Sequence, residues 1–187
     1  MSNMLLNINK FNILSEFSKD YSRKIYGRDV AKKLRMNQKT VSNTLNELEK
    51  EDILKFTHEG KNKYYYMNEF YPYIKEIIKL IEIQRKINFL KKYDKLKGLF
   101  SKLENQSEGI LIIFGSYANF NANERSDLDI FVTGDISIED LETSYNIKIN
   151  IIKSSKKGFN KNEHIIKEII KNHIILMGVE DFVDLIW

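Results

Sequence analysis

Two short motifs in the C-terminal half of the chain carry residue types that could do chemistry. Gly115 and Ser116 follow one apolar run, and Asp127 and Asp129 open a second apolar run after a spacer of ten residues. Residues two apart on a strand project from one face, so the two carboxylates repel each other unless a cation binds between them. Mg²⁺ (or Mn²⁺) prefers such oxygen ligands and commonly binds carboxylates together with substrate phosphates.

The Gly115-Ser116 pair has the properties of a phosphate-binding turn. Glycine lets the backbone approach a ligand closely, and backbone amides that open a helix can donate to phosphate oxygens, as can the Ser116 hydroxyl. The ten-residue spacer has room for one short helix between two strands. An acidic strand end in an unrelated α/β domain is the alternative. We predict a magnesium–nucleotide site formed by Gly115, Ser116, Asp127 and Asp129.

The sequences GSYA and SDLDIFV, on either side of the spacer, resemble the signature of the polymerase-beta-type nucleotidyltransferase superfamily, especially its minimal nucleotidyltransferases. The resemblance extends from about residue 85 to the C-terminus. It implies transfer of a nucleoside monophosphate from a nucleoside triphosphate to a hydroxyl acceptor, with two metals. In that scheme Gly115 and Ser116 hold the triphosphate, and Asp127 and Asp129 are the catalytic metal ligands.

The sequence departs from this family pattern at two positions. The resemblance implies a third carboxylate on a later strand, expected at 147–152, where alternation puts Lys148, Asn150 and Ile152 on one face. Asn150 is then the counterpart of the third carboxylate and a weaker metal ligand. Its amide brings no negative charge and cannot accept the proton of an attacking hydroxyl. Phe120 stands where relatives commonly have glycine, and we expect it to crowd the turn over the phosphates.

The N-terminal part is predicted to contain three helices and a hairpin. Helical spacing covers residues 9–20, 28–35 and 37–51, and two strands are expected at 53–57 and 63–67. The segment 27–67, GRDVAKKLRMNQKTVSNTLNELEKEDILKFTHEGKNKYYYM, resembles a winged helix-turn-helix. That resemblance implies binding of duplex DNA, with the third helix in the major groove and the hairpin on the backbone.

The apolar stripe of the third helix decides which side chains would face DNA. Val41, Leu45 and Leu48 recur at spacings of four and three and are expected to face inward. The remaining positions and the hairpin carry short polar or basic side chains suited to base edges and phosphates. The predicted DNA-binding residues are Gln38, Lys39, Ser42, Asn43, Asn46, Lys61 and Lys63. Use of the same fold for protein contacts is the alternative.

These predictions define an α+β protein with three parts. Residues 1–70 form the winged helix-turn-helix domain, 71–104 a connecting helical region, and 105–187 a small mixed-sheet nucleotidyltransferase domain. In the connecting region, Pro72 suits a first helical turn, and a break is expected near Lys97-Gly98. The long helix either packs on the domains or joins a second copy in a homodimer.

Composition limits the other classes of function. Among 187 residues there is no cysteine and only three histidines, which disfavours disulfide frameworks and structural zinc sites. No apolar run approaches a membrane span and no secretory leader is recognised, so we expect a cytoplasmic protein without membrane partners. The net charge of +4 and the pI of about 9.0 are compatible with nucleic acid.

Three functions follow from this sequence. The first is a Mg²⁺-dependent nucleotidyltransferase that is targeted or regulated by a DNA-binding winged helix. Its acceptor could be a protein such as a partner toxin, because minimal relatives include antitoxins that adenylylate a tyrosine on their toxin. The second is a DNA-binding transcriptional regulator whose catalytically impaired C-terminal domain senses a nucleotide, as Asn150 and Phe120 favour. The third is a protein-interaction scaffold.

Overall fold

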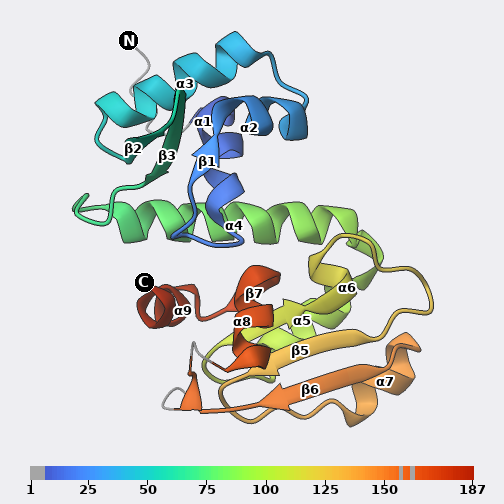
Figure 1. The fold of residues 1–187 in the computed structure, drawn as a ribbon. Coiled ribbons are helices and arrows are strands. Elements are labelled where there is room, and N and C mark those ends of the chain that lie inside the picture. Colours follow the sequence, from blue (N-terminus) through green and yellow to red (C-terminus); the bar gives the residue numbers. More distant parts are fainter. Residues whose placement is uncertain (1–6, 156–157, 161–162) are drawn as a thin grey trace. The chain divides into compact units, whose positions relative to one another are not determined.

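The computed structural model describes residues 7–155, 158–160 and 163–187 (Figure 1). The chain divides into two compact units, residues 1–81 and 82–187. Both units combine helices with a sheet, which confirms the predicted α+β class. None of the helices within the described ranges is both long enough and apolar enough to cross a membrane.

The first unit consists of helices and a three-stranded antiparallel sheet in the order β1-β3-β2. The expected first helix ends early, and its second half is a separate 3₁₀ turn. Strand β1 was not predicted; it adds two residues to the edge of the hairpin. The elements of this unit are α1 (Ile8–Leu14), η1 (Ser15–Phe17), β1 (Ile25–Tyr26), α2 (Gly27–Leu34), α3 (Gln38–Lys50), β2 (Leu54–Glu59) and β3 (Asn62–Met67).

Helix α3 forms where the sequence predicts it. The Asn37 side chain accepts a hydrogen bond from the backbone N–H of Lys39 at 2.8 Å, which caps the helix. Val41, Leu45 and Leu48 are buried. Strands β2 and β3 are joined by a two-residue turn that begins at Gly60, whose φ of 61° suits glycine. These local signals therefore place α3 and the hairpin correctly.

The helical region after residue 71 is divided differently from the prediction. Helix α4 (Ile74–Lys92) begins two residues after Pro72, which lies in the preceding turn. The helix ends before Tyr93, and η2 (Asp94–Leu96) leads into α5 (Lys97–Asn105). The break thus comes a few residues before the predicted Lys97-Gly98. The boundary between the two units falls inside α4, after Ile81.

The second unit contains a four-stranded mixed sheet in the order β6-β5-β4-β7. Strands β5 and β6 are parallel, and the other pairs are antiparallel. Helices α7 and α9 and strand β7 were not predicted. The elements are β4 (Leu111–Phe114), α6 (Gly115–Ala118), β5 (Leu128–Val132), α7 (Glu139–Tyr145), β6 (Ile149–Lys153), α8 (His164–Lys171), β7 (His173–Met177) and α9 (Val179–Ile186).

The sheet of the second unit is covered on both faces, which fixes where each side chain of β5 points. Leu128, Ile130 and Val132 pack into one apolar core with residues of α5 and α7. Phe131 packs into the other core, with residues of α8 and α9. Asp129 shares the face of Phe131 because side chains alternate along a strand. The carboxylates therefore project from the α8–α9 face, at the end of the sheet where β5 begins.

Candidate functional site

The two predicted carboxylates lie at the start of β5 and meet Asn150 of the parallel strand β6. Asp129 and Asn150 are directly paired in the register of the two strands. The Asn150 side-chain amide donates to Asp129 Oδ1 at 2.9 Å and approaches Asp127 Oδ2 at 3.4 Å. The structure thus brings together Asp127, Asp129 and Asn150, the three residues predicted to bind metal.

A fourth residue of this cluster, Lys148, was given no role in the sequence analysis. Its Nζ lies 3.1 Å from Asp127 Oδ2. The hydrogen bonds from Lys148 and Asn150 hold the pKa of the Asp127 carboxyl below its usual value, so this group is ionised at neutral pH. The signal for Lys148 was present in the sequence, because it lies two residues before Asn150 on the same face.

Backbone contacts fix the start of β6 beside the carboxylates. The Leu128 N–H donates to the Lys148 carbonyl at 2.8 Å. On the other side, the Ile149 N–H donates to Glu142 Oε1 of helix α7 at 2.7 Å. A carboxylate that accepts a backbone N–H is a strong, charge-assisted partner. Helix α7 thus helps to position the strand that carries Lys148 and Asn150.

The Gly115 turn packs directly against Asp129. Gly115 has a φ of 67°, and a Cβ built there would lie 2.3 Å from Asp129 Oδ2. Both observations require glycine, first for the left-handed backbone and then for the close approach of the carboxylate. Asn172 donates to the Gly115 carbonyl at 3.0 Å and holds the turn from its other side. Ser116, the other predicted nucleotide-binding residue, follows Gly115 directly in α6.

Phe120 adopts a left-handed backbone with a φ of 59°, which explains why glycine suits this position. Its ring packs on Phe89 and Tyr93, and its carbonyl accepts a hydrogen bond from Lys92. The phenylalanine therefore ties the loop after α6 to the core. These packing contacts lie in the core, whereas we expected the side chain over the phosphate turn.

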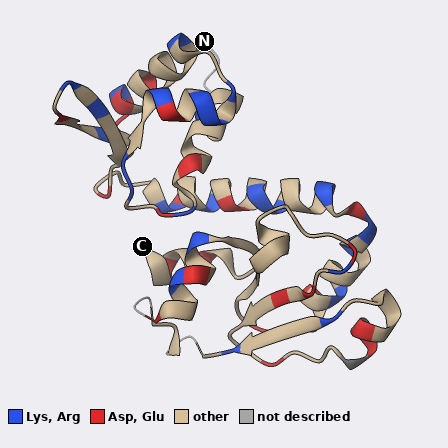
Figure 2. Ribbon diagram, turned by 45° about the vertical axis from the view of Figure 1, so that its right-hand side comes forward, with Lys and Arg blue, Asp and Glu red and all other residues tan. Residues whose placement is uncertain are grey.

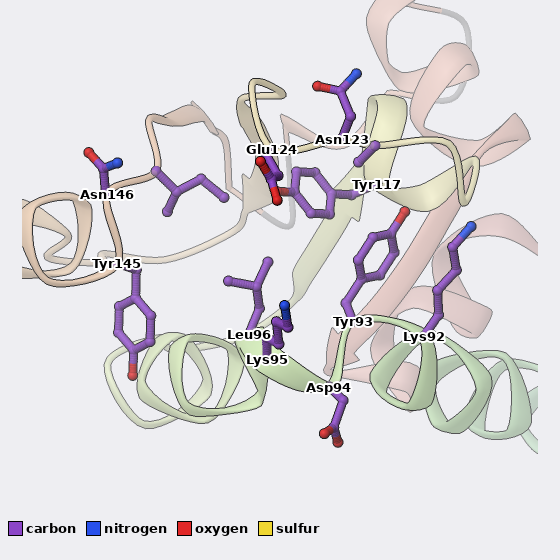
Figure 3. Close-up of a pocket in the computed structure, with 12 residues that line it drawn as sticks. Lys92, Tyr93, Asp94, Lys95, Leu96, Tyr117, Asn123, Glu124, Tyr145 and Asn146 are labelled. Atoms are coloured by element: carbon purple, nitrogen blue, oxygen red, sulfur yellow. The ribbon is translucent and has the colours of Figure 1, made fainter.

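Figure 3 shows the residues that line a pocket of about 620 Å³ in the second unit. Tyr93, Tyr117 and Leu96 line it, and all three belong to or pack against the core that covers Leu128 and Ile130. Burial raises the pKa of both the Tyr93 and the Tyr117 hydroxyl. The pocket is therefore separate from the carboxylate pair, although Tyr117 follows Ser116 directly.

The carboxylate cluster offers the oxygen ligands that a Mg²⁺ site requires, but only two of its side chains are negatively charged. Across the described ranges, no group of three or more His, Cys, Asp or Glu side chains is arranged to hold a metal ion. Asp127 and Asp129 offer hard carboxylate oxygens at the end of the sheet where β5 begins. Asn150 can add an amide oxygen only if its side chain turns over, since its nitrogen now faces the carboxylates.

The residues predicted to bind DNA lie on α3 and the hairpin of the first unit. Asn46 is engaged within the unit, where it accepts from the Tyr65 hydroxyl at 2.8 Å. Lys63 Nζ lies 3.8 Å from the centre of the Phe56 ring and 3.9 Å from Glu49 Oε2. Figure 2 shows Lys and Arg mixed with Asp and Glu over this unit. The remaining predicted residues are exposed; they are Gln38, Lys39, Ser42, Asn43 and Lys61.

Comparison with known proteins defines the class of the second unit. Residues 93–184 match the family model of the nucleotidyltransferase domain. The match supports the nucleotidyltransferase part of the predicted resemblance. The match does not cover the first unit, for which the winged helix-turn-helix stays a prediction.

One relative gives a more specific likeness. A segment of the chain is 41% identical over 58 residues to a protein of Methanocaldococcus jannaschii whose name ascribes to it a protein adenylyltransferase activity. The aligned segment is 27% of this chain, and the chain spans 58% of the length of that relative. No solved structure matches the chain.

Proposed function

We propose that the chain transfers a nucleoside monophosphate from a nucleoside triphosphate to a hydroxyl group on a protein, so that the hydroxyl oxygen bonds to the α-phosphorus and pyrophosphate leaves. The observation that carries this proposal is the contact between the Gly115 turn and Asp129, which brings the predicted phosphate and metal ligands together. The name of the Methanocaldococcus jannaschii relative supports a protein as the acceptor. A tyrosine on a partner toxin is one acceptor of this kind.

Each residue of the site has a role in this proposal. The backbone of the Gly115 turn and the Ser116 hydroxyl bind the triphosphate, and Asp127 and Asp129 hold Mg²⁺. A bound Mg²⁺ would neutralise charge on the phosphates and favour the ionised form of the attacking hydroxyl. Asn150 donates to Asp129 and so orients that carboxylate. Asn172 fixes the Gly115 carbonyl and keeps the turn in the geometry that phosphate binding needs.

Titration with nucleotides tests the proposed site without knowledge of the acceptor. We expect calorimetry with ATP, GTP, CTP and UTP to show binding to at least one nucleotide that depends on Mg²⁺. Asp127→Ala should abolish it, because one of two charged metal ligands is lost. Asp135→Ala is the matched control, since it removes a fully exposed carboxylate that also pairs with a lysine. Absence of binding to all four nucleotides would contradict the proposal.

We propose further that the first unit is a winged helix-turn-helix that binds duplex DNA. Three helices followed by a hairpin, with α3 exposing polar and basic side chains, support this proposal. A shallow groove of about 370 Å³ brings Arg28, Gln38, Ser42 and Lys63 together between α2, α3 and the hairpin. Such a groove offers cations for phosphates beside amide and hydroxyl groups for base edges.

Salt dependence tests this DNA-binding proposal. We expect the chain to bind mixed-sequence duplex at low salt, with an affinity that falls linearly in a log–log plot against salt. Lys39→Gln and Lys61→Gln should each reduce the slope by about 0.9, which is the value for one phosphate contact. Lys50→Gln, at the opposite end of α3, is the matched control and should leave the slope unchanged. Undetectable binding at low salt would exclude the proposal.

Asn150 favours a second function, that of a DNA-binding regulator which senses a nucleotide without turning it over. The amide stands in register with Asp129, where the family resemblance implies a third carboxylate. Nucleotide binding without label transfer to any protein would favour this function. Asn150→Asp would then be expected to produce a large gain in transfer, because the restored carboxylate can accept a proton.

A further inference from the structure

We infer that Lys148 acts as a built-in cation of the site in place of a second divalent metal, so that the chain binds one divalent cation. The inference rests on the proposed function of the same site. It departs from the two-metal scheme that the sequence resemblance implies. The observations that carry it are the position of Lys148 and the charge of the cluster.

The position of Lys148 is fixed by the sheet. The Lys148 carbonyl accepts a hydrogen bond from the Leu128 N–H at 2.8 Å. Leu128 lies between Asp127 and Asp129, so this bond holds the Lys148 backbone beside both carboxylates. Lys148 and Asn150 share one face of the chain, since they are two residues apart. The ammonium lies 3.1 Å from Asp127 Oδ2, while Asn150 contacts Asp129 at 2.9 Å. The nearest partner of Asp127 is therefore Lys148, directly before β6, and that of Asp129 is Asn150 on β6.

The charge of this cluster suits one divalent cation. Asp127 and Asp129 carry two negative charges, Lys148 carries one positive charge, and Asn150 carries none, which leaves one net negative charge. Within the described part of the chain, no third acidic or histidine side chain joins the two carboxylates. Two divalent ions about 4 Å apart, as in two-metal sites, would repel each other strongly over so little protein charge.

An ammonium can perform the electrostatic part of a metal's role. Lysine has three N–H donors and no acceptor, so Lys148 can donate to Asp127 and to a phosphate oxygen at the same time. The Lys148 side chain is 68% exposed, which leaves room for a phosphate beside it. A lysine cannot accept the proton of an attacking hydroxyl while it is charged. Its contribution is therefore to bind and orient phosphate.

Counting bound Mn²⁺ on the full-length chain tests the inference. We expect electron paramagnetic resonance to show one Mn²⁺ per chain. Lys148→Gln should raise the affinity for Mn²⁺ alone by about tenfold, because a competing positive charge is removed. The same change should weaken binding of inorganic tripolyphosphate in the presence of Mn²⁺. The double variant Lys148→Gln with Asn150→Asp should bind two Mn²⁺ ions.

Lys153→Gln is the matched control for these measurements. Lys153 is also an exposed lysine paired with an aspartate, at 3.2 Å, but it lies at the other end of β6. Two Mn²⁺ ions on the wild-type chain would overturn the inference, as would Mn²⁺ and tripolyphosphate affinities that respond equally to Lys148→Gln and Lys153→Gln. In both cases the proposed function would stand. Absence of Mn²⁺ and tripolyphosphate binding in every variant would overturn the proposed function together with this inference.

Discussion

Replacing Asp129 with asparagine is expected to abolish transfer of label from an α-labelled nucleoside triphosphate. Asp129 is the carboxylate that contacts both the Gly115 turn and Asn150. Asparagine has almost the same shape, so the turn and the strand pairing should persist while one charged ligand of the proposed metal site is lost. A bound metal supplies several kcal/mol of transition-state stabilisation, which corresponds to a loss on the order of 10³-fold in rate.

The assay uses purified chain, labelled nucleotide and a lysate that supplies the protein acceptor. Asp135→Asn, which alters an exposed carboxylate elsewhere in the domain, should transfer label like the wild type. Asp129→Asn should retain the wild-type circular dichroism spectrum, which separates a lost ligand from a lost fold. Undiminished transfer by Asp129→Asn would refute the assignment of the site.

The parts of this site that the sequence predicts are those set by local rules. The spacing of Gly115, Asp127 and Asp129 follows from a strand, a turn and the alternation of the next strand. Alternation also predicts Asn150 as the partner, although only the pairing of β5 with β6 shows that it faces Asp129. The spacing of Lys148 from Asn150 puts both on one face, but a single lysine in a lysine-rich chain is too common to mark a site by that spacing alone. Its place beside Asp127 is seen only in the structure, as the 3.1 Å distance from Nζ to Oδ2.

The parts that the sequence does not predict depend on contacts between distant segments. Strand β7 is a short apolar run, HIILM, which periodicity alone cannot distinguish from a buried helix segment. It becomes a strand because it pairs with β4, more than fifty residues earlier. The Asn172 contact with Gly115 depends on that same pairing, so it could not be predicted either.

The pairing of β7 is reinforced by a buried charged cluster that leads to the second large prediction. Glu82 and His173 have fully buried side chains, and His173 Nε2 lies 3.3 Å from Glu82 Oε2. Arg85 donates to Glu82 at 2.8 Å and to the His173 carbonyl at 2.6 Å. His173 is paired with Phe114, the residue before Gly115. The cluster thus fastens α4 to the strand that supports the turn.

Glu82→Gln should destabilise the second unit by about 3–5 kcal/mol, because it leaves the Arg85 guanidinium largely buried without its carboxylate. Urea unfolding followed by fluorescence of Trp187, the single tryptophan, measures this change. Glu168→Gln is the matched control. It also breaks an i,i+3 pair, with Lys171 at 3.0 Å, but that pair is exposed and the loss should be close to experimental error.

The double variant Glu82→Leu with Arg85→Met tests whether the second unit needs the ion pair itself or only well-packed side chains at these two positions. Replacing a buried ion pair with apolar side chains is often neutral or stabilising. This variant also removes the Glu82 and Arg85 partners of the buried His173 ring and carbonyl, so only part of the loss should be recovered. Equal losses in Glu82→Gln and Glu168→Gln would show that the cluster does not stabilise the unit. Because the cluster adjoins the Gly115 turn through Phe114, Glu82→Gln should also weaken nucleotide binding, and the double variant should bind nucleotide more tightly than Glu82→Gln if the turn needs only a firmly held strand.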